Sequence, residues 1–343
     1  MQTLLNTLYL TLPGYLHLDN DTLRFEVERE TRLRVPLHHL GAVVCFGDVL
    51  VSPAAMARLA NEGKTLVLLN AYGRFQARLE GAVSGNILLR QAQFRLADQP
   101  EFCLRQAKAM IAGKLKNSRY VLLRGARDSH QEADAEALRE TAQALAASLR
   151  ALESAPDLNT VRGLEGEAAR RYFAAMGYLL RPELRRDFTP NGRSRRPPRD
   201  RMNALLSFLY SLLMNDCRSA LETVGLDPQL GLLHAVRPGR AALALDLMEE
   251  FRALLADRLA LTLVNRGQLK ADDFMLRPGG AVQLQDDARK TVILAYQTRK
   301  QESTEHPLHK QAVPIGLLPH VQARGLARVL RGEDADYLPY WVR

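Results

Sequence analysis

Cysteine is scarce in this chain of 343 residues, which has three: Cys45, Cys103 and Cys217. No two of them have the CxxC spacing of a metal or redox motif. This scarcity argues against a disulfide framework and against a cysteine zinc cluster. It is typical of a protein that works in a reducing compartment.

Long hydrophobic runs are also missing. No apolar segment approaches the roughly 20 residues that a membrane-spanning helix needs. The first segment, MQTLLNTLYLTLPG, has neither the basic start nor the small-residue cleavage site of a signal peptide. We therefore expect a soluble cytoplasmic protein with no membrane partner.

Several motifs of common enzyme classes do not occur. The sequence has no Walker A motif, no GxGxxG at a strand-to-helix junction and no GxSxG elbow. ATP hydrolysis and redox chemistry are therefore unsupported.

What the chain does have is a sizeable core and a basic charge. It is 47% hydrophobic and 25% charged, the balance of a globular protein, and its length exceeds one domain of roughly 100–200 residues. Lys and Arg number 47 against 38 Asp and Glu, a net charge of +9, and most of the cations are arginine. Because guanidinium matches phosphate oxygens, we expect a nucleic acid partner. Arginine abundance from a GC-rich genome remains the alternative.

Hydrophobic periodicity divides the chain into two regions. Before about residue 95, period-two alternation at Leu23, Phe25 and Val27 and the apolar segments AVVCF and TLVLL indicate short strands, with one short helix in SPAAMARLANEG. After it, apolar residues recur at helical spacing, and Asp157 and Asp200 stand where N-caps belong. We predict an α+β protein with a mainly β domain at 1–95 and a larger all-α domain at 96–343.

Glu165 is the first candidate for chemistry. In the helix expected from Leu158, a wheel at 100° per residue places Glu165 near the middle of the apolar face and Glu167 on the opposite side. A buried carboxylate without a partner is costly, so a cation, a strong donor or a metal should face it. A structural salt bridge with a buried arginine is the alternative.

A second helix, expected over residues 244–259, carries three acids. The wheel places Glu249 at the shoulder of the apolar face, Asp246 about 60° further round, and Glu250 out toward solvent. Spaced i and i+3, Asp246 and Glu249 can address one point in space.

His234 ends the run LGLLH just before this helix. A lone histidine there is more often a hydrogen-bonded structural residue than a ligand. Together with two inward carboxylates, however, an imidazole suits Mn²⁺ or Mg²⁺, which can act as a Lewis acid on a phosphodiester. His306 and His309, in the polar loop HPLHK, are expected at the surface.

Arginines surround these candidates in the sequence. We expect some of them to contact a phosphate backbone, although plain solvated surface, or pairing of the last with Glu249, would explain them too. The set comprises Arg193, Arg195 and Arg196 on an exposed loop at 189–201, Arg237 after His234, and Arg252. The aromatic tail, EDADYLPYWVR, is expected to pack or to mediate contacts.

Three stretches together, GLEGEAARRYF, GRSRRPP followed by NALLSFLYSLLMNDC, and GLLHAVRPGR with LALDLMEEF, resemble a known family. The chain resembles, over essentially its whole length, the CRISPR-associated integrase-nucleases that insert new spacers into the CRISPR array. The resemblance implies a β-rich domain that forms a homodimer and a helical catalytic domain. It also implies a Mn²⁺ or Mg²⁺ ion held by Glu165, His234 and Glu249, with Asp246 as a possible second acid one turn earlier.

The implied reaction is transesterification. The 3′-hydroxyl of prespacer DNA would attack a phosphodiester of the CRISPR repeat, in double-stranded DNA and together with a small CRISPR-associated partner protein. Cleavage of DNA at the same site would make the chain a metal-dependent endonuclease. Two other functions stay open: a structure-selective nuclease without integration, and a non-catalytic nucleic-acid-binding scaffold whose acids only pair with arginines.

Overall fold

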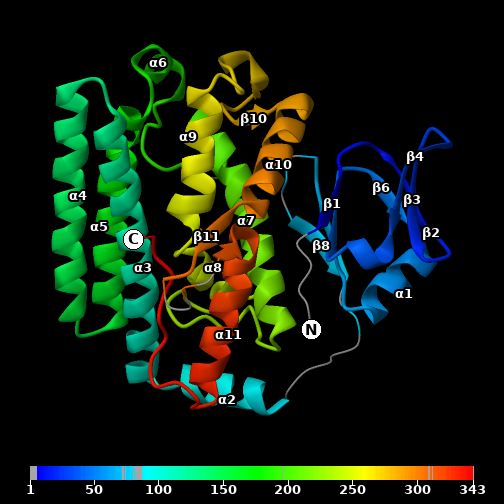
Figure 1. Cartoon of the computed structure of the whole chain (residues 1–343), viewed down its shortest axis with the longest axis horizontal. Coiled ribbons are helices and arrows are strands. Elements are labelled where there is room, and N and C mark those ends of the chain that lie inside the picture. Colours follow the sequence, from blue (N-terminus) through cyan, green and yellow to red (C-terminus); the bar gives the residue numbers. More distant parts are fainter. Residues whose placement is uncertain are drawn as a thin grey trace.

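The computed structural model describes residues 6–71, 73, 75–79, 81, 87–194, 196–307, 310 and 312–342. It has strands at the N-terminal end and helices over most of the rest (Figure 1). Arg195 and His309 lie outside the described residues.

The N-terminal strands form two four-stranded sheets. The first has the order β1-β5-β7-β8, with three parallel strands and β8 antiparallel, and the second has the order β4-β3-β2-β6. Their bounds are β1 Thr7–Leu10, β2 Gly14–Asp19, β3 Thr22–Val27, β4 Glu30–Pro36, β5 Ala42–Phe46, β6 Val49–Val51, β7 Thr65–Leu69 and β8 Phe75–Leu79. Helix α1, Pro53–Asn61, begins at Ser52, whose Oγ accepts from the Ala55 backbone N–H at 3.2 Å.

The strands that sequence periodicity indicated are present. Leu23 and Phe25 are buried on one face of β3, while AVVCF and TLVLL are the adjacent parallel strands β5 and β7. Parallel strands covered on both faces read as continuous apolar runs, which explains why these two segments do not alternate.

The helices that follow are α2 Ile87–Ala97, α3 Pro100–Asp128, α4 Glu132–Glu153, α5 Leu158–Ala175, α6 Arg185–Phe188, α7 Arg201–Thr223, α8 Ala242–Met248, α9 Arg258–Asn265, α10 Asp286–Gln301 and α11 Leu318–Leu330. Short 3₁₀ helices lie at Leu37–His39, Met176–Leu179, Pro182–Leu184, Ala271–Asp273 and Ile315–Leu317. Helix α3 packs against α4 and α5, and α7 packs against α8 and α11. The two expected N-caps are confirmed, because Asp157 accepts from the Thr160 N–H at 2.8 Å and Asp200 from the Asn203 N–H at 2.7 Å.

The C-terminal region is not all helical as predicted. Strands β9 Phe274–Leu276 and β10 Val282–Leu284 form one antiparallel pair, and β11 Ser303–Glu305 and β12 Ala312–Pro314 form another. Three residues are too few to produce a period-two pattern. The first pair depends on its turn, where Gly279 and Gly280 adopt φ of +88° and +77°.

The helix predicted over residues 244–259 is also wrong in one respect, because it is interrupted. Helix α8 ends at Met248, a turn follows, and a π-helical segment, Arg252–Asp257, leads into α9. The three residues of the turn, Glu249, Glu250 and Phe251, therefore do not follow the phase of a straight wheel.

The aromatic tail packs against the helices, as expected. Tyr337 and Tyr340 are buried, and Figure 1 shows the red C-terminal segment running along α3. His306, predicted at the surface, is instead fully buried beside Gln322, 3.2 Å from its Oε1. None of the helices in the described ranges is long and apolar enough to cross a membrane.

Candidate active site

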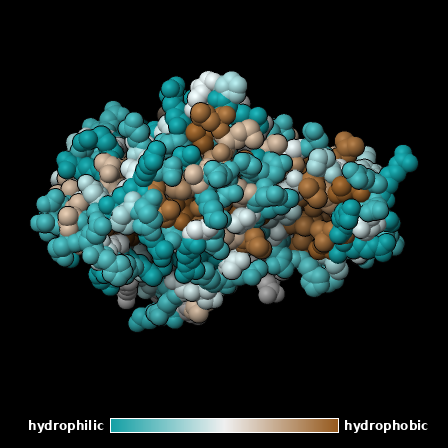
Figure 2. All heavy atoms as spheres, turned by 90° about the horizontal axis from the view of Figure 1, so that it is seen from above, coloured by the Kyte–Doolittle hydropathy of each residue, from teal (hydrophilic) through white to brown (hydrophobic). Residues whose placement is uncertain are grey.

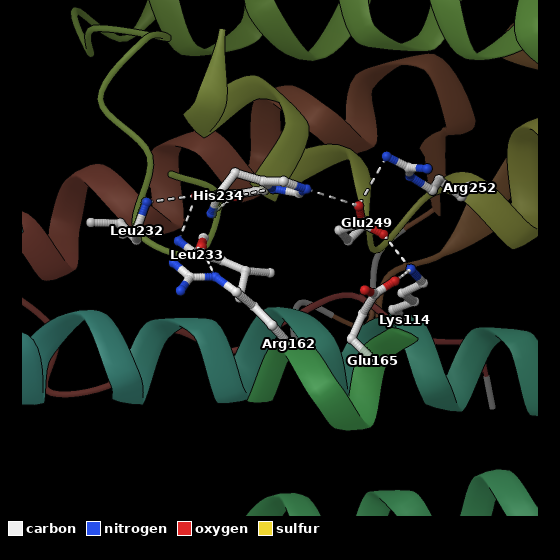
Figure 3. Close-up of polar contacts among 9 residues, drawn as sticks. Lys114, Arg162, Glu165, Leu232, Leu233, His234, Glu249 and Arg252 are labelled. Carbon is white, nitrogen blue, oxygen red and sulfur yellow. Dashed lines mark hydrogen bonds and ion pairs between the residues drawn. The ribbon is translucent and has the colours of Figure 1, made fainter. Parts of the chain in front are cut away.

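Four separate elements bring the candidate residues together (Figure 3). Lys114 comes from α3, Glu165 from α5, His234 from the loop after α7, and Glu249 from the turn after α8. The sequence-predicted trio of Glu165, His234 and Glu249 thus lies in one cluster, and Lys114 stands between its two carboxylates.

Asp246 fixes the loop that carries His234. One carboxylate oxygen accepts the backbone N–H groups of Leu232 at 2.6 Å and Leu233 at 2.9 Å, and the other accepts the N–H of His234 at 2.9 Å. The His234 ring adds a contact, with Nδ1 2.6 Å from Asp246 Oδ1. Asp246 is fully buried and has four partners, so its task is to hold the loop and the ring.

The same contact orients the imidazole. Because a carboxylate oxygen accepts, Nδ1 of His234 is the donor to Asp246. The other ring nitrogen, Nε2, lies 3.9 Å from Glu249 Oε1 and faces the cluster. Arg162 steadies the loop from α5 by donating to the Leu233 carbonyl at 2.9 and 2.6 Å.

Glu249 is 3% exposed and is held by two cations. Lys114 Nζ lies 2.7 Å from its Oε2, and the Arg252 guanidinium lies 2.9 Å from its Oε1. Burial alone would raise the pKa of Glu249, but Arg252, Lys114 and His234 outweigh it and lower the pKa to about 2. Glu249 is therefore an anion at neutral pH.

Glu165 completes the cluster from the side of solvent. Its carboxylate is 27% exposed and forms an ion pair with Lys114, while Glu167 on the same helix pairs with the exposed Arg170 and Arg171. The prediction that Glu165 faces inward and Glu167 outward is confirmed. The expected cation is present, but it is a lysine rather than an arginine.

Glu250 corrects the sequence prediction. It was expected in solvent, and it is fully buried, with its carboxylate accepting from the Tyr340 backbone N–H at 2.7 Å, from Gln322 Nε2 at 3.1 Å and from the Tyr337 hydroxyl. The interruption after Met248 rotates Glu250 away from the direction that a continuous helix would give it.

The arginines have different environments. Arg193 was expected on an exposed loop, but it is partly buried: it donates to Asn203 Oδ1 at 2.7 Å and lies over the Tyr210 ring at 5.2 Å. Arg196 and Arg237 are exposed. Arg252 forms an ion pair with Glu249, three residues earlier, which is one of the two alternatives that the sequence left open. Its guanidinium carbon also lies 4.9 Å from the centre of the Tyr210 ring.

A cleft of about 340 Å³ opens beside the cluster. Its walls combine cations and aromatic rings, and they include Lys114, Glu165, Phe173, Arg193, Tyr210, Arg252 and Asp257. Glu165 and Lys114 both line this cleft.

The donor set has the chemistry of a hard divalent cation site. Two carboxylates and one imidazole nitrogen are the ligands that Mn²⁺ and Mg²⁺ accept, and a carboxylate on the far ring nitrogen is the usual support of a metal-binding histidine. Within the described residues, Glu249 Oε2 is buried and accepts no well-formed hydrogen bond, and the Lys114 ion pair compensates its charge. In the described part of the chain, no three His, Cys, Asp or Glu side chains converge on one point as they stand. Lys114 occupies the position between the carboxylates, so a metal would have to displace its amine.

Two functional residues escaped the sequence interpretation. Lys114 lies 51 residues before Glu165 in a helix that reads as ordinary, AKAMIAGKLKNS, and Arg162 donates to the Leu233 backbone carbonyl and to Asn159 Oδ1. Nothing in the spacing of either residue signals its partner. The one signal in the sequence was that an inward Glu165 requires a cation. This requirement does not identify the residue that supplies the cation.

A family model described as CRISPR associated protein Cas1 matches residues 8–298 of the chain. A curated relative, the CRISPR-associated endonuclease Cas1 1 of Moorella thermoacetica, is 54% identical over 344 residues and covers 100% of both chains.

Two solved structures have a similar fold. A chain of a Cas6-RT-Cas1–Cas2 complex has a TM-score of 0.83 at 24% identity, covering 98% of this chain and 36% of that one. A casposase bound to integration product has a TM-score of 0.82 at 20% identity, covering 97% of this chain and 92% of that one.

Asp257 lies deep in the cleft and gives a prediction on stability. It accepts the Tyr210 hydroxyl at 2.6 Å and is 2% exposed. Burial raises the pKa of Asp257 to about 6, although Tyr210 and Arg252 favour the charged form. Folding therefore takes up a proton here, and the stability that this gives is complete below about pH 4 and is lost as the pH rises through about 6.

Replacing Asp257→Asn should remove this pH dependence. Between pH 4 and pH 7.5 the free energy of unfolding of the wild type should fall, relative to that of the variant, by roughly 2–3 kcal/mol. Urea unfolding at a series of pH values measures it. Asp128→Asn, at an exposed carboxylate 70% accessible, should keep the wild-type slope. Parallel curves for wild type and Asp257→Asn would contradict the assignment.

Proposed function

The chain belongs to the Cas1 family of CRISPR-associated proteins, and we propose that it is a metal-dependent DNA integrase and endonuclease of spacer acquisition. It would join the 3′-hydroxyl of prespacer DNA to a phosphodiester of the CRISPR repeat by transesterification. No ATP is required, because one phosphodiester bond forms as another breaks.

The observation that carries this proposal is that Lys114 pairs with both Glu165 and Glu249, while His234 Nε2 lies 3.9 Å from Glu249 Oε1, beside a cleft that Glu165 and Lys114 line. Glu165, His234 and Glu249 would hold Mn²⁺ or Mg²⁺. When bound, such an ion supplies Lewis acidity at the phosphate oxygens. Asp246 contacts Nδ1 of His234 and turns Nε2 toward the site, the nitrogen that would be the ligand.

The cations of the site have a second task in this reaction. The leaving and attacking oxygens share negative charge with the phosphate, and fixed positive charges near it stabilise that charge. Arg252 is held over Tyr210 by stacking and by Glu249, so its position is set before DNA arrives. Lys114 would move from between the carboxylates toward the phosphate when the metal takes its place.

The names of the similar proteins support this class of reaction. The curated relative is named an endonuclease, and one structural neighbour is a casposase bound to integration product. The neighbour from a Cas1–Cas2 complex supports a small CRISPR-associated partner protein. The exposed Arg196 and Arg237 would contact the phosphate backbone of double-stranded DNA, together with Arg193 and Arg252 in the cleft and with Arg195.

A homodimer through the N-terminal strands is part of the proposal. Tyr15 and Leu50 are register partners in β2 and β6, and their side chains are 41% and 71% exposed. Leu12, 43% exposed, lies just before β2. Figure 2 shows hydrophobic surface on the side of these strands. An exposed apolar group of this kind on an edge strand favours pairing with a second copy.

A structure-selective nuclease is the second candidate, favoured by the endonuclease name of the relative. Water in place of the 3′-hydroxyl would then cleave branched DNA at the same site. A comparison of branched-substrate cleavage with joining at a repeat, each with and without the small partner protein, separates the two functions.

Glu165 gives the first test. With Mn²⁺ or Mg²⁺, the wild type should join a duplex oligonucleotide with free 3′-hydroxyls to a plasmid that carries the repeat. Glu165→Gln should lower the rate at least about 100-fold, because the site loses an anionic ligand. Glu167→Gln, on the opposite side of α5 and paired with Arg170, is the matched control and should keep the wild-type rate. Equal rates for folded Glu165→Gln and wild type would refute the site.

Lys114 gives the second test, by titration calorimetry with Mn²⁺. If the amine occupies the cation position, Lys114→Met should bind Mn²⁺ about tenfold more tightly, because a competing charge between the two carboxylates is gone. In EDTA the same variant should unfold at a lower temperature than wild type. A scaffold whose acids only pair with cations would show no Mn²⁺ binding in either protein.

Leu50 gives a test of the dimer. Leu50→Glu places a charge in the proposed contact and should weaken dimerisation at least about tenfold. Leu276→Glu, a leucine 73% exposed in β9, is the matched control and should leave the dimer intact. Analytical ultracentrifugation over a concentration series measures both. A Leu50→Glu protein that sediments as the wild type does would place the contact elsewhere.

A further inference from the structure

The Glu250 carboxylate is enclosed by the end of the chain. Of its three donors, the Tyr337 hydroxyl and the Tyr340 backbone N–H belong to the tail, and Gln322 Nε2 belongs to α11. Gln322 also donates to the Leu338 carbonyl and to the Tyr337 oxygen, each at 3.0 Å. No cation contacts Glu250 in the described residues. The tail therefore supplies the polar partners that this buried acid needs.

Asn117, on α3, connects the same turn and tail. Its Nδ2 donates to the backbone carbonyls of Glu250 at 2.7 Å and Tyr340 at 2.9 Å, and its Oδ1 accepts the Val342 N–H at 3.0 Å. Asn117 is fully buried, so each of these contacts replaces water. One residue before it, Lys116 lies over the Trp341 ring at 3.8 Å.

Gly113 makes this close approach possible. A Cβ at this position would lie 2.9 Å from Pro339 Cβ, 3.2 Å from Glu250 Cγ and 3.4 Å from the Tyr340 carbonyl oxygen. Glycine in the middle of a helix costs stability relative to alanine. Here the missing side chain leaves the room that the tail and the turn occupy.

All of these contacts involve residues that are close in sequence to those of the candidate active site. Glu250 is adjacent to Glu249, and Asn117 is one helical turn from Lys114. The turn itself has weak internal support: the N–H groups of Glu249 and Phe251 donate to carbonyls three residues back, at 3.2 and 3.0 Å, and the regular α-helical pattern is lost. A turn with so few regular bonds needs support from outside to fix Glu249.

We propose that residues 337–342, the C-terminal strap, position the turn that carries Glu249. The strap forms hydrogen bonds with both Glu250 and Asn117. Because Asn117 is on α3, these bonds set the distance between that turn and Lys114 on the same helix. Tyr337, Asn117 and Glu250 are then positioning residues that touch neither metal nor DNA. The effect of the strap on metal and DNA rests on the function proposed above, but its effect on the turn does not.

Tyr337→Phe in the whole chain tests the strap, because it removes one donor to Glu250 and keeps the ring. Tyr296→Phe is the matched control: its hydroxyl also donates to a carboxylate, Asp216, at 2.7 Å and is also buried, but that carboxylate belongs to α7 and not to the turn. Both variants lose a phenol donor, so both should lose some global stability.

Three measurements then separate positioning from mere stability. Hydrogen exchange of the amides at residues 246–252 should be about tenfold faster in Tyr337→Phe and unchanged in Tyr296→Phe. Mn²⁺ binding by calorimetry should be about tenfold weaker in Tyr337→Phe alone, the usual scale for outer residues of a metal site. Strand joining at saturating Mn²⁺ should also slow in Tyr337→Phe alone.

The strap proposal is overturned if the two variants give the same exchange at 246–252. If the wild type neither binds Mn²⁺ nor joins DNA, the proposed function fails, while faster exchange in Tyr337→Phe still supports the strap.

A second pair of variants approaches the strap from α3. Gly113→Ala raises helix propensity but pushes on Pro339, so exchange at 246–252 should rise and Mn²⁺ binding should weaken by about the same factors as in Tyr337→Phe. Gly163→Ala, in α5, where an added Cβ would have no neighbour within 4 Å, controls for propensity and should leave both unchanged. If Gly113→Ala behaves like Gly163→Ala, the close approach has no positioning role and the proposal is wrong.

Discussion

The structure depends on the compensation of one buried anion, Glu249. Removing a carboxylate from water is costly unless opposite charge and hydrogen bonds replace the water, and Glu249 has Lys114 on one oxygen and Arg252 on the other. Lys114 is on α3, and it also needs Glu165 on α5. The charge balance of a single side chain therefore determines how three elements, distant in sequence, must pack.

This balance also allows the proposed site for a divalent cation to exist in the folded protein before the cation binds. Two carboxylates that face each other repel unless a positive charge lies between them. Lys114 supplies that charge with an amine on a flexible stem, which can leave without moving the backbone. Asp246 has no such freedom, since its four contacts all go to one loop and its histidine. The cluster thus combines a fixed ligand loop with one movable cation.

Much of this was predictable from the sequence, and the remainder has identifiable causes. Helical phase within α5 placed Glu165 inward and Glu167 outward, because that helix is regular over its length. The same method misplaced Glu250, because phase is lost where α8 gives way to a turn and a π-helical segment, and no Pro or Gly marks the break. Lys114 and the strap were missed for another reason: their contacts join positions more than fifty residues apart, which no local periodicity reports. The short β9–β10 pair escaped because three-residue strands have no period to detect.

The three acids of the segment LDLMEEF show that partners, more than position on a helix, determine what a carboxylate does. Glu249 and Glu250 are neighbours and both buried, yet cations lower the pKa of the first to about 2, whereas burial raises that of the second to about 8 despite three donors. Neutral donors form hydrogen bonds to the buried carboxylate, but they stabilise its negative charge less than water does. Glu249 is thus kept charged, the state that the proposed metal site requires of it, and all contacts of Asp246 go to the loop that it holds. Glu250 is satisfied by the strap. A pattern of acids on its own therefore cannot identify a metal ligand; the charge of the groups that meet each acid can.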